Sequence, residues 1–173
     1  MRQDALRRDT DGDAVDVIVD QWHRERPELD ASAKGITGRI IRLADLFQQT
    51  FHRSFEPLGI SEGEYGILVA LRRAGDPFQL TPTELARHRM MTSGGMTAAI
   101  DRLERKRLLR RSPNPADRRG SLIGLTDEGR RTVDAAMEAH VIAEHELVRA
   151  LRPADRAALE RSLRTLLLAI DPT

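Results

Sequence analysis

The sequence predicts a mainly α-helical protein with one small β-hairpin. Two observations favour this fold class. Apolar residues recur at three- and four-residue intervals over most of the chain, as they do along one face of a helix. Residues 102–126 differ, because a basic helix end there leads into two short strand-like segments that flank a tip containing Pro, Asn and Asp. We therefore expect helices on both sides of a single hairpin.

The N-terminal region is predicted to contain a polar tail and two amphipathic helices. Residues 1–12 are polar and charged, which favours a frayed tail. Apolar residues at helical spacing then predict a helix from about Asp13 to the residue before Pro27. A longer periodic stretch, Ile36 to Phe55, predicts a second helix.

Two capping boxes mark helix starts in the middle of the chain. Ser61–Glu64 and Thr81–Glu84 each have a hydroxyl side chain at the N-cap and a Glu three residues later. The first box predicts a helix that ends at Gly75, and the second predicts a short helix to about Met90. A brief extended segment is expected between them at Phe78–Leu80.

A further helix and the hairpin complete this middle region. We expect the helix at Thr92–Arg107, the strands at Leu108–Ser112 and Ser121–Leu125, and a turn-forming tip at Pro113–Asp117. A tight turn joins this helix to the one before it. The order helix, turn, helix, hairpin is the layout of a winged helix-turn-helix, whose second helix enters the major groove of DNA.

Two long helices are predicted after the hairpin. Thr126 is the expected N-cap of a helix that continues to Leu151. Pro153 begins the last helix, which has an apolar stripe that extends to Ile170. These helices have little neighbouring structure along the chain to cover their apolar faces.

The elements predict three parts. Residues 1–57 would hold the tail, an added helix and a dimerisation helix, 58–126 a winged helix-turn-helix DNA-binding core, and 127–173 the C-terminal dimerisation helices. The apolar stripes of the outer helices need a partner, and the simplest partner is a second copy of the chain. We therefore expect a homodimer.

The charge of the chain is uneven. Its net charge is only +1, but residues 1–30 carry a net −4 and residues 102–119 a net +6. A local basic stripe is typical of a surface that contacts DNA phosphates. Arg105, Lys106 and Arg110 are the candidates for these contacts.

The start of the second helix of the pair has small side chains. Thr92, Ser93, Gly94 and Thr97 lie on its opening turns, and a slim helix end can approach base edges closely. The positive end of the helix dipole also suits phosphate. The same residues also fit an ordinary N-cap with glycines in a loop, and the sequence leaves both interpretations open.

The tip of the hairpin carries two arginines. Arg118 and Arg119 follow the turn directly, and an exposed tip arginine can reach a narrow minor groove. Asp117 can hold such a guanidinium in a bidentate pair. A solvated, charged turn is the alternative.

Several classes of protein and site are excluded or disfavoured. The chain has no cysteine, which excludes disulfides, thiolate zinc sites and a cysteine-based oxidant sensor. No secretory leader or membrane-length apolar run is evident, which favours a cytoplasmic protein with no membrane contact. No metal-ligand spacing, cofactor motif or nucleophile–base arrangement stands out, so we expect no metal, no cofactor and no enzyme. A winged-helix module for protein interaction, without a specific DNA site, is the alternative function.

The run LTPTELARHRMMTSGGMTAAIDRLERKRLLRRSPNPADRRGSLIGLTDEGR resembles the winged helix-turn-helix core of MarR-family transcriptional regulators. The likeness covers Leu58–Arg130 closely and includes the DRR-x-x-x-x-x-LT pattern at Asp117–Thr126. It implies a homodimer that binds double-stranded DNA at a pseudo-palindromic operator. It also implies a repressor that a small phenolic or anionic effector releases from DNA. Ser93 and Thr97 would then touch bases or phosphates, with Arg119, oriented by Asp117, in the minor groove.

The added N-terminal helix resembles that of a urate-responsive branch of this family. The pocket of that branch combines a Trp, an acidic residue and two Arg residues. Trp22 and Arg111 match two of these positions, whereas Gly66 and Ala99 stand at the acidic position and at the other Arg position. With Tyr65, these residues form the candidate ligand site, and their chemistry predicts a ligand other than urate. A Trp on an added helix is more often a packing anchor than a ligand contact, and this interpretation of Trp22 stays open.

Overall fold

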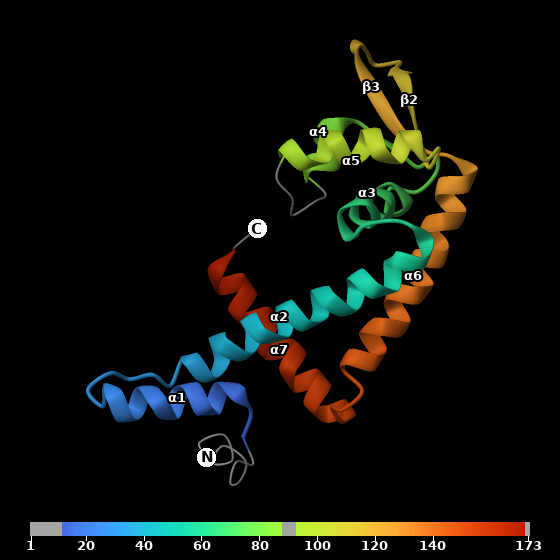
Figure 1. Ribbon diagram of the computed structural model, residues 1–173. Helices are drawn as coiled ribbons and strands as arrows, with labels where there is room; N and C mark the ends of the chain where they lie inside the picture. Colours follow the sequence, from blue (N-terminus) through green and yellow to red (C-terminus); the bar gives the residue numbers. More distant parts are fainter. Residues whose placement is uncertain (1–11, 88–92, 172–173) are drawn as a thin grey trace, which may run out of the picture. The chain divides into compact units, whose positions relative to one another are not determined.

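The structure is a computed structural model that describes residues 12–87 and 93–171. Within these ranges the chain is mainly helical and has one small antiparallel sheet, which confirms the predicted fold class (Figure 1). It forms two compact units, one that ends at Gln49 and one that begins at Thr50. The predicted tail and the predicted junction near Met90 and Thr92 lie outside the described residues, apart from Gly12.

The first unit contains helix α1 (Ala14–Glu25) and most of helix α2 (Lys34–Phe55). Asp13 caps α1 by accepting hydrogen bonds from two backbone N–H groups of its first turn. Val15 is buried against Gly38 of α2, where the absent side chain allows close approach. Arg39 of α2 donates to Asp13 at 2.8 Å and to Asp16 at 2.6 Å. Both predicted N-terminal helices are thus confirmed.

The second unit is built around helix α3, whose apolar face is almost completely buried. Its Ser61–Glu64 capping box is present as predicted. Figure 1 shows α4 (Pro82–Arg87) and α5 (Ser93–Arg105) beside α3 (Glu62–Arg73), and α6 (Asp127–Leu147) leading away from the hairpin of residues 109–125. The helices of this unit after α2 are η1 (Glu56–Leu58), α3 (Glu62–Arg73), α4 (Pro82–Arg87), α5 (Ser93–Arg105), α6 (Asp127–Leu147) and α7 (Pro153–Ile170).

The core of the second unit draws on more than the middle of the chain. Residues of α2 and α6 join those of α3, α4, α5 and the sheet, because α6 packs along α3. A winged core that ended at residue 126 would lose Val133 and Ala136, which are fully buried. The large side chains with almost no exposed surface are Phe55, Ile67, Leu68, Leu71, Leu85, Leu103, Ile123 and Val133.

The sheet has three antiparallel strands in the order β1-β3-β2. They are β1 (Gln79–Leu80), β2 (Leu109–Asn114) and β3 (Asp117–Leu125). Strands β2 and β3 form the hairpin, which we call the wing. The two strands are longer than the sequence predicted, and the five-residue tip predicted at Pro113–Asp117 is wrong.

Only two residues, Pro115 and Ala116, lie between the wing strands. Asn114 closes the turn, because its side-chain oxygen accepts the backbone N–H of Ala116 at 3.0 Å. Pro113 is tolerated inside β2 because β2 is an edge strand. One side of an edge strand has no neighbouring strand, so a proline there need not remove a hydrogen bond of the sheet. The pairing shifts by a bulge directly after Pro113.

Three predicted element ends are also corrected. Helix α6 ends at Leu147 rather than at Leu151, because Arg152 must be extended to precede Pro153 and the chain turns before it. Helix α5 ends before Arg107, whose backbone is left-handed with a φ of 60°. Phe78 likewise has a φ of 58°, so the strand expected from Phe78 begins at Gln79.

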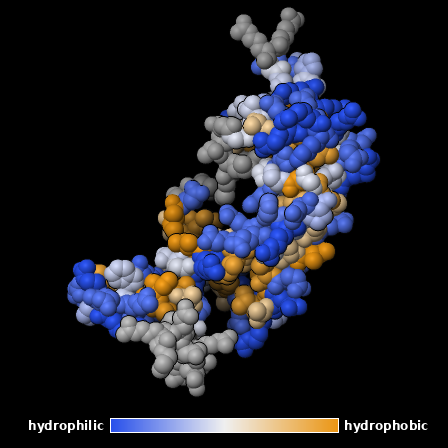
Figure 2. All heavy atoms as spheres, in the orientation of Figure 1, coloured by the Kyte–Doolittle hydropathy of each residue, from blue (hydrophilic) through white to orange (hydrophobic). Residues whose placement is uncertain are grey.

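The last helix leaves most of its apolar side chains exposed. Figure 2 shows hydrophobic residues at the surface near the C-terminal end of α7, whereas the end of the unit with the wing is mainly hydrophilic. No helix among the described residues is both long and apolar enough to cross a membrane. The exposed large apolar residues of α7 are Leu159, Leu163, Leu166, Leu167, Leu168 and Ile170.

Candidate nucleic-acid interface

Helix α5 has one buried face and one open face. Ala99, Ile100 and Leu103 are at most 4% exposed and pack into the core, which determines how the helix is rotated about its axis. Thr97 and Ala98 lie on the exposed side. The small side chains expected at a DNA surface are therefore turned away from the core wherever the structure describes them.

The opening turn of α5 is only partly described. Thr92 lies outside the described residues, and the side chains of Ser93 and Gly94 are not described either. At Gly95, one residue later, an added Cβ would meet no atom of the described residues within 4 Å. Packing against the described residues therefore does not require a glycine at position 95.

The base of the wing is tied to α5 by Arg111. Its guanidinium bonds the carboxylates of Asp101 and of Glu104, the latter at 3.2 Å. Both carboxylates lie on α5 and Arg111 lies on β2, so one side chain links the helix to the hairpin. These ion pairs connect β2 to α5 at the base of the wing.

The wing is also tied to the start of α6. The hydroxyl of Thr126 accepts the N–H of Gly129 and donates to the Arg107 carbonyl at 2.7 Å. Gly129 lies so close to the strand that an added Cβ would be 1.9 Å from the Leu108 carbonyl oxygen. Only glycine permits this approach.

The tip of the wing carries the residues expected at the minor groove. Asp117 is exposed and pairs with Asn114 in the ladder. Arg118 and Arg119 lie in β3 directly after it, and their side chains are not among those described. The structure therefore places the arginines at the tip, while their reach toward DNA stays a prediction.

The basic stripe is less free than the sequence suggests. Arg105 and Arg110 are exposed, and neither forms an ion pair among the described residues. Lys106, by contrast, donates to Glu64 and to the Gly59 carbonyl, both at 2.8 Å. The phosphate contact of Lys106 stays a prediction, and its bonds to Glu64 and Gly59 give this side chain a competing role inside the protein.

Glu64 is the acidic partner that sequence reasoning missed as a functional residue. It was visible as a capping residue, and the structure adds ion pairs to Lys106 at 2.8 Å and to Arg102 at 3.3 Å. Burial opposes ionisation of this carboxyl, but hydrogen bonds from Lys106, the Ser61 backbone and Arg102 together lower its pKa below the ordinary value of 4.5. Glu64 is therefore a buried carboxylate that carries its charge at neutral pH.

The predicted ligand residues lie in different surroundings. Trp22 belongs to the first unit, is 41% exposed, and has the ammonium of Lys34 5.7 Å from the centre of its ring. Tyr65, Gly66 and Ala99 belong to the second unit, where Tyr65 and Ala99 are part of the buried core. Arg111 of the same unit is engaged with α5, so a common pocket of all five residues stays a prediction.

An aromatic cluster surrounds Tyr65. Its ring stacks on Phe55 at a centroid distance of 4.2 Å, and the His140 ring lies 5.2 Å from it. Burial raises the pKa of the Tyr65 hydroxyl, which donates to the sulfur of Met137 at 3.0 Å. Among the described atoms, the buried Nδ1 of His140 has no hydrogen-bond partner.

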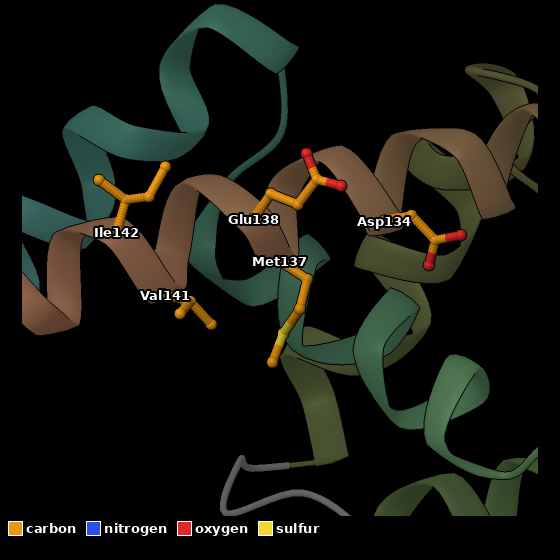
Figure 3. Close-up of a pocket in the computed structure, with 5 residues that line it drawn as sticks. All are labelled: Asp134, Met137, Glu138, Val141 and Ile142. Carbon is orange, nitrogen blue, oxygen red and sulfur yellow. The ribbon is translucent and has the colours of Figure 1, made fainter.

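An open hollow of about 610 Å³ lies along α6 in the second unit. Figure 3 shows its five lining residues, all on α6, with apolar side chains beside two carboxylates. Across the described residues, no group of His, Asp and Glu side chains could hold a metal ion. The residues that line the hollow are Asp134, Met137, Glu138, Val141 and Ile142.

Comparison with known proteins matches the wing-bearing region and most of the chain. The sequence model of the MarR family matches residues 58–120. The HTH-type transcriptional regulator PecS of Dickeya dadantii (strain 3937) is 35% identical over 134 residues, which cover 78% of this chain and 81% of that protein. The matched proteins are transcription regulators rather than enzymes.

Two solved structures with similar folds contain DNA. The MarR-family regulator Sco3205 of Streptomyces coelicolor, in complex with DNA, is 28% identical with a TM-score of 0.73 and covers 84% of this chain and 95% of its own. A mutant form of MarR from E. coli, complexed with operator DNA, is also 28% identical, with a TM-score of 0.68. That match covers 80% of this chain and 99% of the other.

Proposed function

Because the chain belongs to the MarR family of DNA-binding transcription regulators, we propose that it is a homodimeric repressor of a pseudo-palindromic operator, released by a small phenolic or anionic ligand. The observation that carries the DNA part is the pairing of an open, small-residue face on α5 with an adjacent wing that ends in arginines. The same proposal places the protein in the cytoplasm.

The proposed DNA contacts divide by chemistry. Ser93, Gly94 and Thr97, with Thr92 before them, approach base edges or phosphates in the major groove. Arg105 and Arg110 neutralise phosphates, a role that their exposure supports. At the tip, Arg118 and Arg119 reach the adjacent minor groove, and Asp117 orients Arg119.

The proposed dimer covers the exposed apolar face of α7. A run of exposed leucines is unfavourable in water, and burying the half-exposed side chain of each would contribute about half of the 1.5–3 kcal/mol that full burial provides. Two-fold pairing of two chains sets two winged units side by side, as a palindrome requires. The predicted division into residues 1–57, 58–126 and 127–173 is retained as part of this proposal.

The proposed effector is a small aromatic or anionic molecule. The cluster around Tyr65 supports an aromatic ligand, because the unsatisfied Nδ1 of His140 can bond a phenol or carboxyl. Trp22, Gly66, Ala99 and Arg111 remain the other proposed ligand residues. A ligand that frees Arg111 from Asp101 would loosen the wing from α5 and so weaken DNA binding.

The alternative function is a winged-helix module for protein interaction, without a specific DNA site. The solved relatives that contain DNA argue against it, since their fold covers most of this chain. Selection of bound fragments from genomic DNA separates the two functions. Enrichment of a palindrome, with binding that weakens steeply as salt rises, is expected for the repressor. Recovery of random fragments would contradict it.

The sharpest test of the interface is the variant Arg119→Ala. Loss of a minor-groove arginine should weaken operator binding by about 1–3 kcal/mol, or roughly five- to 150-fold, with an unchanged fold. Arg149→Ala is the matched control, because Arg149 is an exposed arginine that follows the far end of α6 from the wing. Equal affinities of both variants, measured by fluorescence anisotropy, would show that the wing arginine does not read DNA.

A further inference from the structure

Glu64 is the one buried charged residue among the described residues, and its side chain is only 3% exposed. It lies in the first turn of α3, where Oε2 accepts the Ser61 N–H at 2.9 Å and completes the capping box. A capping box needs only a polar acceptor at this position, and Gln serves as well as Glu. The cap alone therefore does not explain a buried negative charge.

The charge of Glu64 is balanced by the end of α5. Arg102 lies in the last turn of α5 and Lys106 directly follows the helix, where its backbone N–H still donates to the Arg102 carbonyl at 3.0 Å. The two side chains therefore lie on the same side. Arg102 donates to Oε1 at 3.3 Å, and Lys106 donates to Oε2 at 2.8 Å. The three side chains thus join the start of α3 to the last turn of α5.

Lys106 extends this network to a second point. Its ammonium also donates to the Gly59 carbonyl at 2.8 Å. Gly59 ends η1, the short helix that connects the end of α2 to α3, and has a left-handed φ of 64°. One lysine therefore ties the end of α5 both to α3 and to the connector that precedes α3.

We propose that Glu64 is a positioning residue that sets the direction of α5, and hence the angle at which the open face of α5 meets DNA. Apolar packing determines the rotation of α5, and the ion pairs at and directly after its last turn restrain the far end of the helix. Arg111 restrains the same helix from the side of the wing. The inference rests on the proposed function, in which α5 reads the operator.

The variant Glu64→Gln separates positioning from simple electrostatics, because the two predict opposite signs. Gln keeps the shape and the cap but removes one negative charge next to two cations. Electrostatics alone predicts tighter binding to any DNA. Positioning predicts looser binding to the selected operator, by at least about tenfold, with no loss of affinity for random DNA.

Glu62→Gln is the matched control for charge. Glu62 is exposed on the same turn of α3 and forms no ion pair among the described residues. It should leave the ratio of operator to random-DNA affinity unchanged. If Glu64→Gln also leaves this ratio unchanged, or raises operator affinity, the proposal is overturned.

Lys106→Gln removes the same ion pair by changing its exposed partner. This variant also tests the proposal if Glu64→Gln does not fold. Positioning predicts a loss confined to the operator. A direct phosphate contact by Lys106 predicts an equal loss on both DNAs, with the salt slope reduced by about one, and this result would contradict the proposal. In the double variant, the loss of operator affinity should be clearly less than the sum of the two single losses, since both substitutions remove the same ion pair.

An experiment without DNA distinguishes failure of this inference from failure of the proposed function. Amide hydrogen exchange in residues 99–105 should be faster in Glu64→Gln than in the unmodified protein or Glu62→Gln. Unchanged exchange there overturns the positioning role, whatever DNA is bound. If exchange is faster in Glu64→Gln but the unmodified protein selects no operator, the restraint on α5 is supported and the proposed repressor function is contradicted.

Discussion

Helices α5 and α7 have the same kind of amphipathic pattern, but the apolar face of α5 is buried and that of α7 is exposed. The apolar face of α5 is at most 4% exposed at Ala99, Ile100 and Leu103, because α3 and the sheet cover it. The apolar face of α7 is open, with Leu163 44% and Leu167 58% exposed. A periodic apolar pattern thus predicts that one face of a helix will be buried. Whether the same chain covers that face depends on which other elements pack against it.

The two helices also differ in what fixes them. Around α5, ion pairs of Glu64 and Arg111 add direction to apolar packing. Around α7, the ion pair within the helix, between Arg164 and Glu160, is exposed and contributes little to stability. The described part of the proposed DNA-reading region is therefore packed within one chain, whereas α7 needs a second copy in the proposed dimer.

The largest expected effect comes from a charge on the open face of α7. Leu163→Glu should dissociate the dimer, because it removes an apolar contact twice per dimer and buries two carboxylates, for a loss of at least about 3 kcal/mol. Sedimentation velocity should show a monomer, and operator affinity should fall with it. Thr165→Glu places the same charge two residues along, on the opposite side of the helix, and should remain dimeric. A dimeric Leu163→Glu would remove α7 from the interface.

A smaller effect is expected at the junction that completes the winged region. Gly129→Ala should lower the free energy of unfolding by about 1–3 kcal/mol, since its Cβ would overlap the Leu108 carbonyl oxygen. Chemical denaturation measures this loss, and the variant should stay a dimer. Gly95→Ala is the control, because open space surrounds Gly95 and alanine favours a helix. Equal stabilities of the two variants would refute the close approach at Gly129.

The smallest effect concerns the charge of Glu64. Its pKa is lower in the folded protein than the ordinary value of 4.5, so its ionised form stabilises the fold. That contribution is complete above pH 4.5 and is lost as the pH falls through the lowered value. Glu64→Gln should therefore show a shallower loss of stability below pH 4.5 than the unmodified protein, while Glu62→Gln should follow the unmodified protein. Parallel curves for all three proteins would exclude this contribution.

Much of the fold could be predicted from local chemistry. The capping boxes at Ser61 and Thr81, the N-cap Thr126 and the start at Pro153 involve neighbours within one turn, so the sequence alone indicates them. The wing tip could not be predicted in the same way. The pairing of Asn114 with Asp117, and the edge position that tolerates Pro113, depend on strands that meet only in the sheet.

The candidate site divides along the same line. The sequence shows the basic character of residues 102–119 and the small side chains at the start of α5. Together they predict a DNA-binding surface. The sequence could not show which cations are free. Lys106 and Glu64 are 42 residues apart, and Arg111 and Asp101 are 10 apart, so their pairing depends on how the helices and the wing pack.

The sequence by itself determined the order of helices and hairpin, the helix starts, and the resemblance to a family that binds DNA. These properties follow from spacing, caps and residue type, which act within a few positions. The tertiary structure alone decided that Glu64 pairs with Arg102 and Lys106, that Gly129 must be a glycine, and that α7 is left uncovered. Each of these depends on the distance between residues far apart in the chain, and packing sets that distance.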